Sequence, residues 1–161
     1  MKIKNTKYFI AILFLIILNG CSSSLPEIKN AEVEEKSIYE NDLRINNKQI
    51  YCWVNKMPGD KPRFNITGEL NIFDDSEYNI KTVTIKTIFI MQDNKNVYQF
   101  TPNMETKFSG NIKIITFSTI KGMLLSLQLD TSKNVDIKIL LTDSANEIEY
   151  FIQNIVIEEV H

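Results

Sequence analysis

Histidine, cysteine and glycine are scarce in this chain, and each scarcity excludes a class of catalytic or metal site. The 161 residues include one histidine, the terminal His161, two cysteines and five glycines. A Ser-His-Asp or Cys-His arrangement needs a histidine beside its nucleophile, and most zinc and copper sites use histidine ligands. The glycines are scattered singly, so the chain has no glycine-rich phosphate loop. We therefore predict no catalytic residues, no metal site and no cofactor.

The first twenty residues divide into three zones. Lys2, Lys4 and Lys7 give a basic start, residues 9–18 form an unbroken apolar run, and Asn19-Gly20-Cys21 follows it. This order is typical of a secretory signal peptide. The apolar run is about half the roughly twenty residues that a membrane-spanning helix needs. A retained transmembrane anchor is the alternative, if the flanking residues extend the run.

The segment Leu18-Asn19-Gly20-Cys21 resembles the lipobox of bacterial lipoproteins, and the resemblance covers the signal segment only. It implies cleavage before Cys21, a thioether from the Cys21 thiol to diacylglycerol, and attachment to the lipid bilayer. Each buried methylene contributes about 0.8 kcal/mol, so two or three acyl chains hold a protein almost permanently. Ser22 after the cysteine favours the outer membrane of a Gram-negative envelope, at its periplasmic face or at the cell surface. The alternative is a secreted protein in which Cys21 is incidental.

The remaining chain divides into a tether and one domain. We predict residues 1–20 as signal peptide, 21–47 as lipidated cysteine and flexible tether, and 48–161 as the folded domain. The tether is rich in serine and charge and contains Pro26. Alternatively, residues 37–45 dock as a first edge strand. Without residues 1–20 the formal net charge is about −5, and an acidic domain lacks the basic footprint of a nucleic-acid binder.

Apolar and polar residues alternate from Gln49 onwards, which is the period of half-buried β-strands. The clearest strands are 64–72, 83–91 and 135–142, and a change of phase near Asn154 predicts a β-bulge. Residues 123–129 also allow a helix. Seven to eight short strands without intervening helices predict an antiparallel β-sandwich, immunoglobulin-like or transthyretin-like. A small closed barrel is the alternative.

The segment Ile50–Val54 contains two apolar faces. Cys52 lies on the same face of the strand as Ile50 and Val54. Because no second free cysteine is present to form a disulfide with it, Cys52 is most simply a small buried hydrophobic residue. If that face lies inside, Tyr51 and Trp53 form an exposed aromatic pair, and such residues dominate binding hot spots. If it lies outside, Trp53 is a core residue. The sequence leaves both orientations open.

Two functions follow, and neither is enzymatic. The first is a non-catalytic envelope lipoprotein that binds or assembles with an unknown envelope protein, by analogy of architecture alone. The second is an inhibitor or immunity-type lipoprotein that inserts the loop Met57–Arg63 into an enzyme cleft. The candidate binding residues are Tyr51, Trp53, Met57, Asp60, Lys61 and Arg63. An enzyme acting on polysaccharide is less well supported, and an acidic turn at Asp74, Asp75 and Glu77 is a weak calcium candidate.

Overall fold

The computed structural model describes residues 38–40, 43–74, 79–144 and 146–161. These belong to one compact unit, Val33–His161. Cys21, the predicted signal peptide and most of the predicted tether lie outside the described residues. In the part of the chain that is described, no helix is long and apolar enough to cross a membrane.

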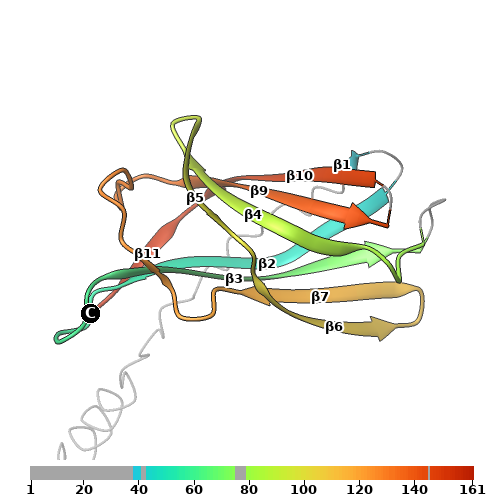
Figure 1. The fold of residues 1–161 in the computed structure, drawn as a ribbon, viewed down its shortest axis with the longest axis horizontal. Helices are drawn as coiled ribbons and strands as arrows, with labels where there is room; N and C mark the ends of the chain where they lie inside the picture. The colour runs from blue at the N-terminus through green and yellow to red at the C-terminus, as the bar shows by residue number, and fades with distance from the viewer. Residues whose placement is uncertain (1–37, 41–42, 75–78, 145) are drawn as a thin grey trace, which may run out of the picture. The chain divides into compact units, whose positions relative to one another are not determined.

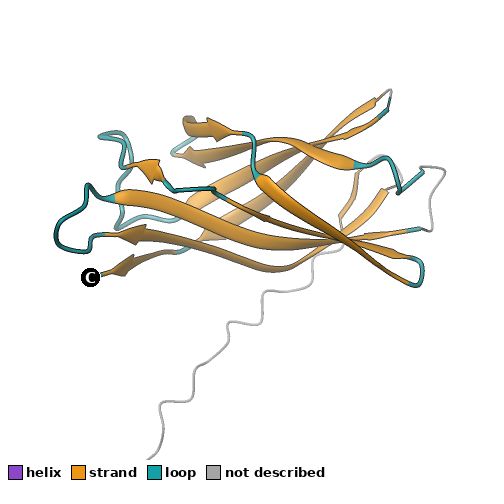
Figure 2. Cartoon of the chain, turned by 60° about the horizontal axis from the view of Figure 1, so that its bottom comes forward, coloured by secondary structure: helices purple, strands orange, loops and turns teal. Residues whose placement is uncertain are grey.

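The described residues form two packed β-sheets (Figures 1 and 2). The strands are β1 (Ile38–Glu40), β2 (Leu43–Asn55), β3 (Arg63–Phe73), β4 (Thr84–Gln92), β5 (Lys95–Phe100), β6 (Asn103–Ser109), β7 (Ile112–Ser118), β8 (Met123–Leu124), β9 (Val135–Asp143), β10 (Asn146–Ile155) and β11 (Ile157–Val160). The seven-stranded sheet has the order β1-β2-β3-β7-β6, with β11 also paired to β2 and β8 to β3. The four-stranded sheet has the order β10-β9-β4-β5.

The predicted β-sandwich is confirmed, and the strand order is the one that an immunoglobulin-like sandwich has. The run β2-β3-β7-β6 corresponds to strands A, B, E and D, and β10-β9-β4-β5 corresponds to G, F, C and C′. Eight described strands are six residues or longer, as predicted, and β1, β8 and β11 are short additions. Of the ambiguous residues 123–129, only the first two form a strand.

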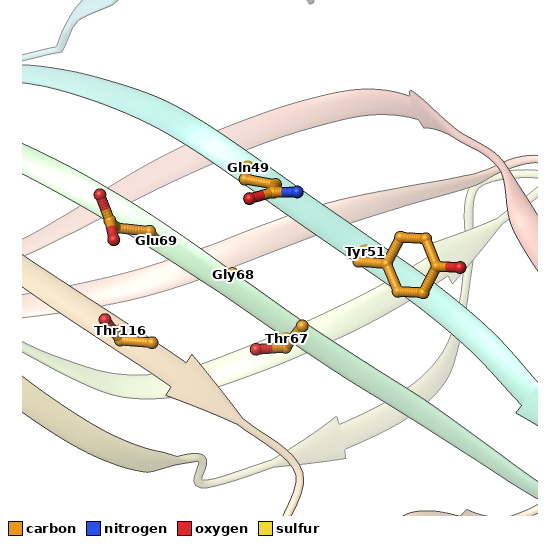
Figure 3. Close-up of a pocket in the computed structure, with 6 residues that line it drawn as sticks. All are labelled: Gln49, Tyr51, Thr67, Gly68, Glu69 and Thr116. Atoms are coloured by element: carbon orange, nitrogen blue, oxygen red, sulfur yellow. The ribbon is translucent and has the colours of Figure 1, made fainter. Parts of the chain in front are cut away.

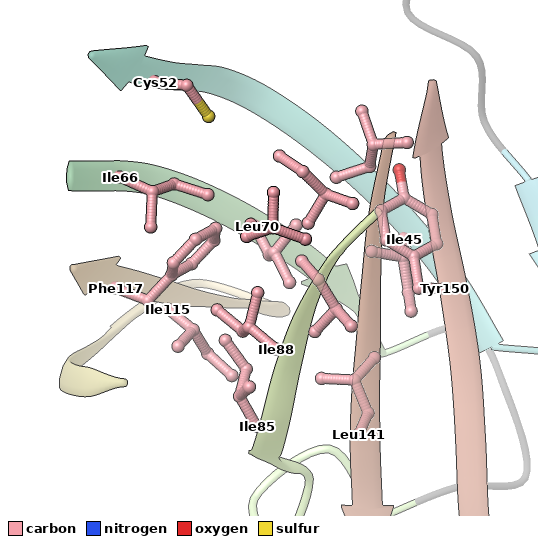
Figure 4. Close-up of a cluster of buried hydrophobic side chains, with 14 of the residues drawn as sticks. Ile45, Cys52, Ile66, Leu70, Ile85, Ile88, Ile115, Phe117, Leu141 and Tyr150 are labelled. Carbon is pink, nitrogen blue, oxygen red and sulfur yellow. The ribbon is translucent and has the colours of Figure 1, made fainter. Parts of the chain in front are cut away.

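The core lies between the sheets and is filled by alternate residues of each long strand (Figure 4). In β3, Phe64, Ile66, Leu70 and Ile72 are fully buried, while Asn65, Thr67, Glu69 and Asn71, on the opposite parity, are half-buried. Isoleucines from β4, β9 and β10 close the core from the four-stranded sheet. The packed face thus follows the period of two that the sequence shows.

The first and last strands of the domain differ from the rest in where they begin or how they pair. β2 begins at Leu43 and β1 at Ile38, so the sheet starts inside the range predicted as tether, as the edge-strand alternative had it. The predicted bulge at Asn154 is confirmed, with φ +61° and a shift of register between β10 and β9. The chain then leaves β9, and β11 pairs in parallel with β2.

Among the described residues, one buried side chain is charged. Lys113 lies on the inward face of β7 and is 5 % exposed. Its Nζ donates to the carbonyl oxygens of Lys81 at 2.9 Å and Val83 at 2.6 Å, which ties the β3–β4 connection to the seven-stranded sheet. Burial lowers the pKa of the Lys113 ammonium group. The lysine therefore donates hydrogen bonds to two carbonyl groups of the β3–β4 connection, which partly offsets the cost of its burial.

Gly68 of β3 lies directly against the ring of the buried Phe117. A Cβ atom at Gly68 would lie 2.5 Å from Cζ of Phe117, whose side chain is 1 % exposed. Only a residue without a side chain fits here without displacement of that ring.

We expect Gly68→Ala to lower the free energy of unfolding by about 1–3 kcal/mol, because the new methyl group overpacks the core. Urea denaturation of the full chain measures the loss. Phe117→Leu is the second variant of the pair. It should lower the free energy of unfolding by less in the Gly68→Ala background than in the unaltered protein. Strictly additive losses would show that the two residues are not in contact.

Candidate functional site

The structure decides which face of β2 is inside. Cys52 and Val54 are buried at 1 % and 0 % exposure, so Tyr51 and Trp53 point away from the core. Tyr51 is 38 % exposed and Trp53 is half-buried, and their ring centroids lie 5.5 Å apart. Of the two orientations that the sequence allows, the structure has the one in which Tyr51 and Trp53 point outward.

Cys52 is a core residue in every respect. Burial raises the pKa of its thiol to about 12. A thiol that stays protonated near neutral pH is neither a nucleophile nor a metal ligand. Cys52 therefore fills space in the core beside Val54.

The C-terminal strand adds an acidic group beside the aromatic pair. The parallel pairing of β11 places Glu158 opposite Trp53. The Tyr51 hydroxyl donates a hydrogen bond to the Glu158 carboxylate, and this bond is the main reason that the pKa of Tyr51 is raised. The bond fixes the Tyr51 ring on the sheet and leaves the second Glu158 oxygen available to a donor from solvent or from a partner.

A shallow depression continues from Tyr51 across the outer face of three strands (Figure 3). Its lining residues are Gln49 and Tyr51 of β2, Thr67, Gly68 and Glu69 of β3, and Thr116 of β7. Together with Trp53 and Glu158 these residues form one surface, which we call the aromatic face. It combines two aromatic rings with amide, hydroxyl and carboxylate groups, and Glu69 has an exposed cation, Lys48, at 3.7 Å.

The β2–β3 loop projects from one end of the sandwich. Met57 is 49 % exposed, and Asp60 and Lys61 are exposed as well. The base of the loop is held by two contacts: Asn55 Oδ1 accepts a hydrogen bond from the Met57 backbone N–H, and the Lys56 N–H donates to the Val160 carbonyl at 2.8 Å. The loop is thus anchored at its base and exposed beyond it.

Arg63 belongs to β3 and not to the loop. It pairs with Asn55 in the ladder, and its Nη1 donates to the Gly122 carbonyl oxygen at 3.1 Å. Its half-buried side chain has the same outward parity as Trp53. The six predicted binding residues therefore separate into two groups. Tyr51, Trp53 and Arg63 lie on the outer face of the sheet, and Met57, Asp60 and Lys61 lie in the loop at its end.

Sequence reasoning missed Glu158 and the polar lining of the depression. Glu158 reaches Tyr51 only because β11 changes sheet and pairs in parallel with β2, a contact between segments more than one hundred residues apart. The lining residues Glu69 and Thr116 come from two strands that become neighbours only through the sheet order. The outward parity of Gln49, Thr67 and Glu69 was visible in the sequence, but their proximity was not.

No group of three or more histidine, cysteine or acidic residues that could hold a metal ion occurs within residues 43–74, 79–144 and 146–161. Of the acidic turn, Asp75 lies outside the described residues, as does Glu77. No known protein family, characterised protein sequence or solved structure matches this chain.

Proposed function

We propose that this chain is a lipoprotein of the cell envelope, anchored to a membrane through acylated Cys21, whose β-sandwich domain binds another protein without catalysis. The observation that carries the binding role is the aromatic face. Aromatic residues that remain accessible on a rigid sheet lose little conformational freedom when a partner covers them, which makes them effective binding anchors. The anchor rests on the resemblance of residues 18–21 to a lipobox.

The chemistry of the aromatic face supports a protein partner with basic and apolar groups. Glu158 and Glu69 place carboxylates on either side of Tyr51, which suits an arginine or lysine of the partner. Trp53 offers an apolar surface and an indole N–H at the same place. The acidic charge of the whole domain would steer such a partner towards it.

A second function, inhibition of an enzyme, is favoured by the β2–β3 loop. Exposed Met57 stands on a loop whose base is fixed by Asn55 and Lys56, and Gly59 has φ +98° at its tip. A loop of this kind can enter a cleft with little loss of entropy. In that case the loop, and not the aromatic face, would carry the affinity.

Lipidation is tested by Cys21→Ser. We expect the variant to remain unprocessed or soluble and to incorporate no palmitate analogue, because the hydroxyl group cannot form the thioether. Cys52→Ser is the matched control, since its buried thiol should make no difference to labelling. Metabolic labelling followed by fractionation of the membranes measures both. Equal labelling of the Cys21→Ser variant and the unaltered protein would contradict the proposal.

Partner binding is tested by capture from detergent-solubilised envelope, with the full-length protein as bait. We expect Trp53→Ala to weaken capture by about 2 kcal/mol, as the loss of an aromatic hot spot does. Phe151→Ala is the matched control, because Phe151 is an outward-facing aromatic residue, 38 % exposed, that lies on β10 in the four-stranded sheet. Each variant is first shown to unfold at the same urea concentration as the unaltered protein.

The same capture experiment separates the two functions. Loss of the partner with Trp53→Ala, and retention with Asp60→Lys and Lys61→Glu, supports binding through the aromatic face. The reverse result supports the loop and an inhibitory function. If Phe151→Ala weakened capture as much as Trp53→Ala, the aromatic face would not be the binding site.

A further inference from the structure

β6 (Asn103–Ser109) closes one side of the seven-stranded sheet (Figure 1). Among the described residues it pairs with β7 and with no strand on its other side. All its residues are exposed except Met104, which is half-buried. Such an edge presents backbone N–H and C=O groups that can pair with a further strand. The strand contains no proline and no bulge that would prevent this.

The geometry of the β6–β7 hairpin shows which backbone groups face the open edge. The turn between the strands consists of Gly110 and Asn111, and Ser109 is paired with Ile112. The residues that flank a two-residue turn exchange both hydrogen bonds, and the pattern then alternates along the strand. Met104, Thr106 and Phe108 therefore direct their N–H and C=O groups outward.

The sequence of β6 is complementary to itself when two copies run antiparallel. With Thr106 of one copy opposite Thr106 of the other, all seven residues of the strand find a partner. The resulting cross-strand pairs, each occurring twice, are Glu105 with Lys107, Met104 with Phe108, and Asn103 with Ser109. In this register a negative charge faces a positive charge, an apolar residue faces an apolar residue, and a polar residue faces a polar residue.

This register also suits the backbone. It sets the outward groups of Thr106 against each other, so that this pair exchanges hydrogen bonds. Glu105 and Lys107 then form non-hydrogen-bonded pairs, in which opposite Cα atoms lie about 4.5 Å apart and side chains are closest. Both side chains project from the outer face of the sheet, on the side of Thr116 and Ile114.

The opposite face of the same register covers an exposed aromatic ring. Phe108 is 56 % exposed, and its ring lies 5.7 Å from Nζ of the buried Lys113. Met104, which packs against the core, would stand beside Phe108 of the second copy. The pairing would therefore remove apolar surface from water on the inward face as well.

The two edge strands of the four-stranded sheet, β10 and β5, are less suited to such pairing. β10 carries Glu147 and Glu149 and no basic residue, so two copies would bring only acidic groups together. β5 carries one charged residue, Lys95, and the hydroxyl of its Tyr98 is bonded to Leu124 and Ser126 of the β7–β9 connection. β6 combines an open edge with matched charges.

We propose that two copies of this chain associate through β6, antiparallel and centred on Thr106, so that the two seven-stranded sheets become one continuous sheet. The occupant of the edge is a second copy because the charge pattern of β6 is its own complement. The contact uses residues of β6, none of which belongs to the aromatic face, and Glu105 is the cross-strand neighbour of Thr116 at the margin of that face. Self-association and capture of a partner are therefore measured separately.

The test is sedimentation velocity of the full-length protein in density-matched detergent, at concentrations up to about 100 µM. The unaltered protein should be dimeric. Glu105→Lys places lysine opposite Lys107 twice, and Lys107→Glu places glutamate opposite Glu105 twice. Either single change should raise the dissociation constant of the dimer by about tenfold or more.

The charge swap makes the test specific. The double variant Glu105→Lys/Lys107→Glu restores both opposite-charge pairs and should restore the dimer. An equimolar mixture of the two single variants should form a heterodimer, because every contact in it is again between opposite charges. Lys95→Glu on β5 is the control and should leave the dimer unchanged.

A monomer at every concentration overturns the proposal. So does a dimer that persists in both single variants, because the contact must then lie elsewhere. Loss of the dimer in the double variant as well as in the single variants also overturns it, since that result would show that the charge pairing has no part in association.

Discussion

Alternate residues of β2 and β3 are buried between the two sheets. Because successive side chains of a strand point to opposite faces, this burial decides which side chains of β2 and β3 point outward. Full burial of an aliphatic or aromatic side chain contributes about 1.5–3 kcal/mol, and Val54, Phe64, Ile66 and Leu70 are all completely buried. In β3, a slip of one residue would exchange this apolar series for the polar series of Asn65, Thr67 and Glu69. The register of the sheet is therefore fixed by several favourable contributions at once.

Two display surfaces follow from that register. With Cys52 inside, Tyr51 and Trp53 must be outside, and the bulge at Asn154 delivers β11 to the vacant edge of β2 so that Glu158 meets Tyr51. The rings are then held by a rigid sheet and not by a loop. At one edge of the same sheet lies β6, with Glu105 and Lys107 on the outer face. A single packed core thus positions both the aromatic face, where we propose that a different protein binds, and β6, where we propose that a second copy pairs.

The sequence predicts most of the fold but, of the aromatic face, only Tyr51 and Trp53. The strict alternation in 64–72 and 135–142 and the change of phase near Asn154 were sufficient to predict the sandwich and the bulge. The orientation of β2 could not be predicted, because both of its faces are apolar at residues 50–54. The inward position of Lys113 could not be expected from its polarity, and the carbonyl groups of Lys81 and Val83 that accept its hydrogen bonds explain it. The contact between β11 and β2 joins distant segments and leaves no local pattern.

The orientation of β2 is the central claim, and Trp53 reports on it directly because it is the only tryptophan in the chain. The measurement is acrylamide quenching of tryptophan fluorescence in the folded full-length protein, compared with the same protein in denaturant. A half-exposed Trp53 on the outer face should be quenched in the folded protein, at a rate below that of the unfolded chain. Fluorescence that acrylamide does not quench until the domain unfolds would place Trp53 in the core and contradict the account.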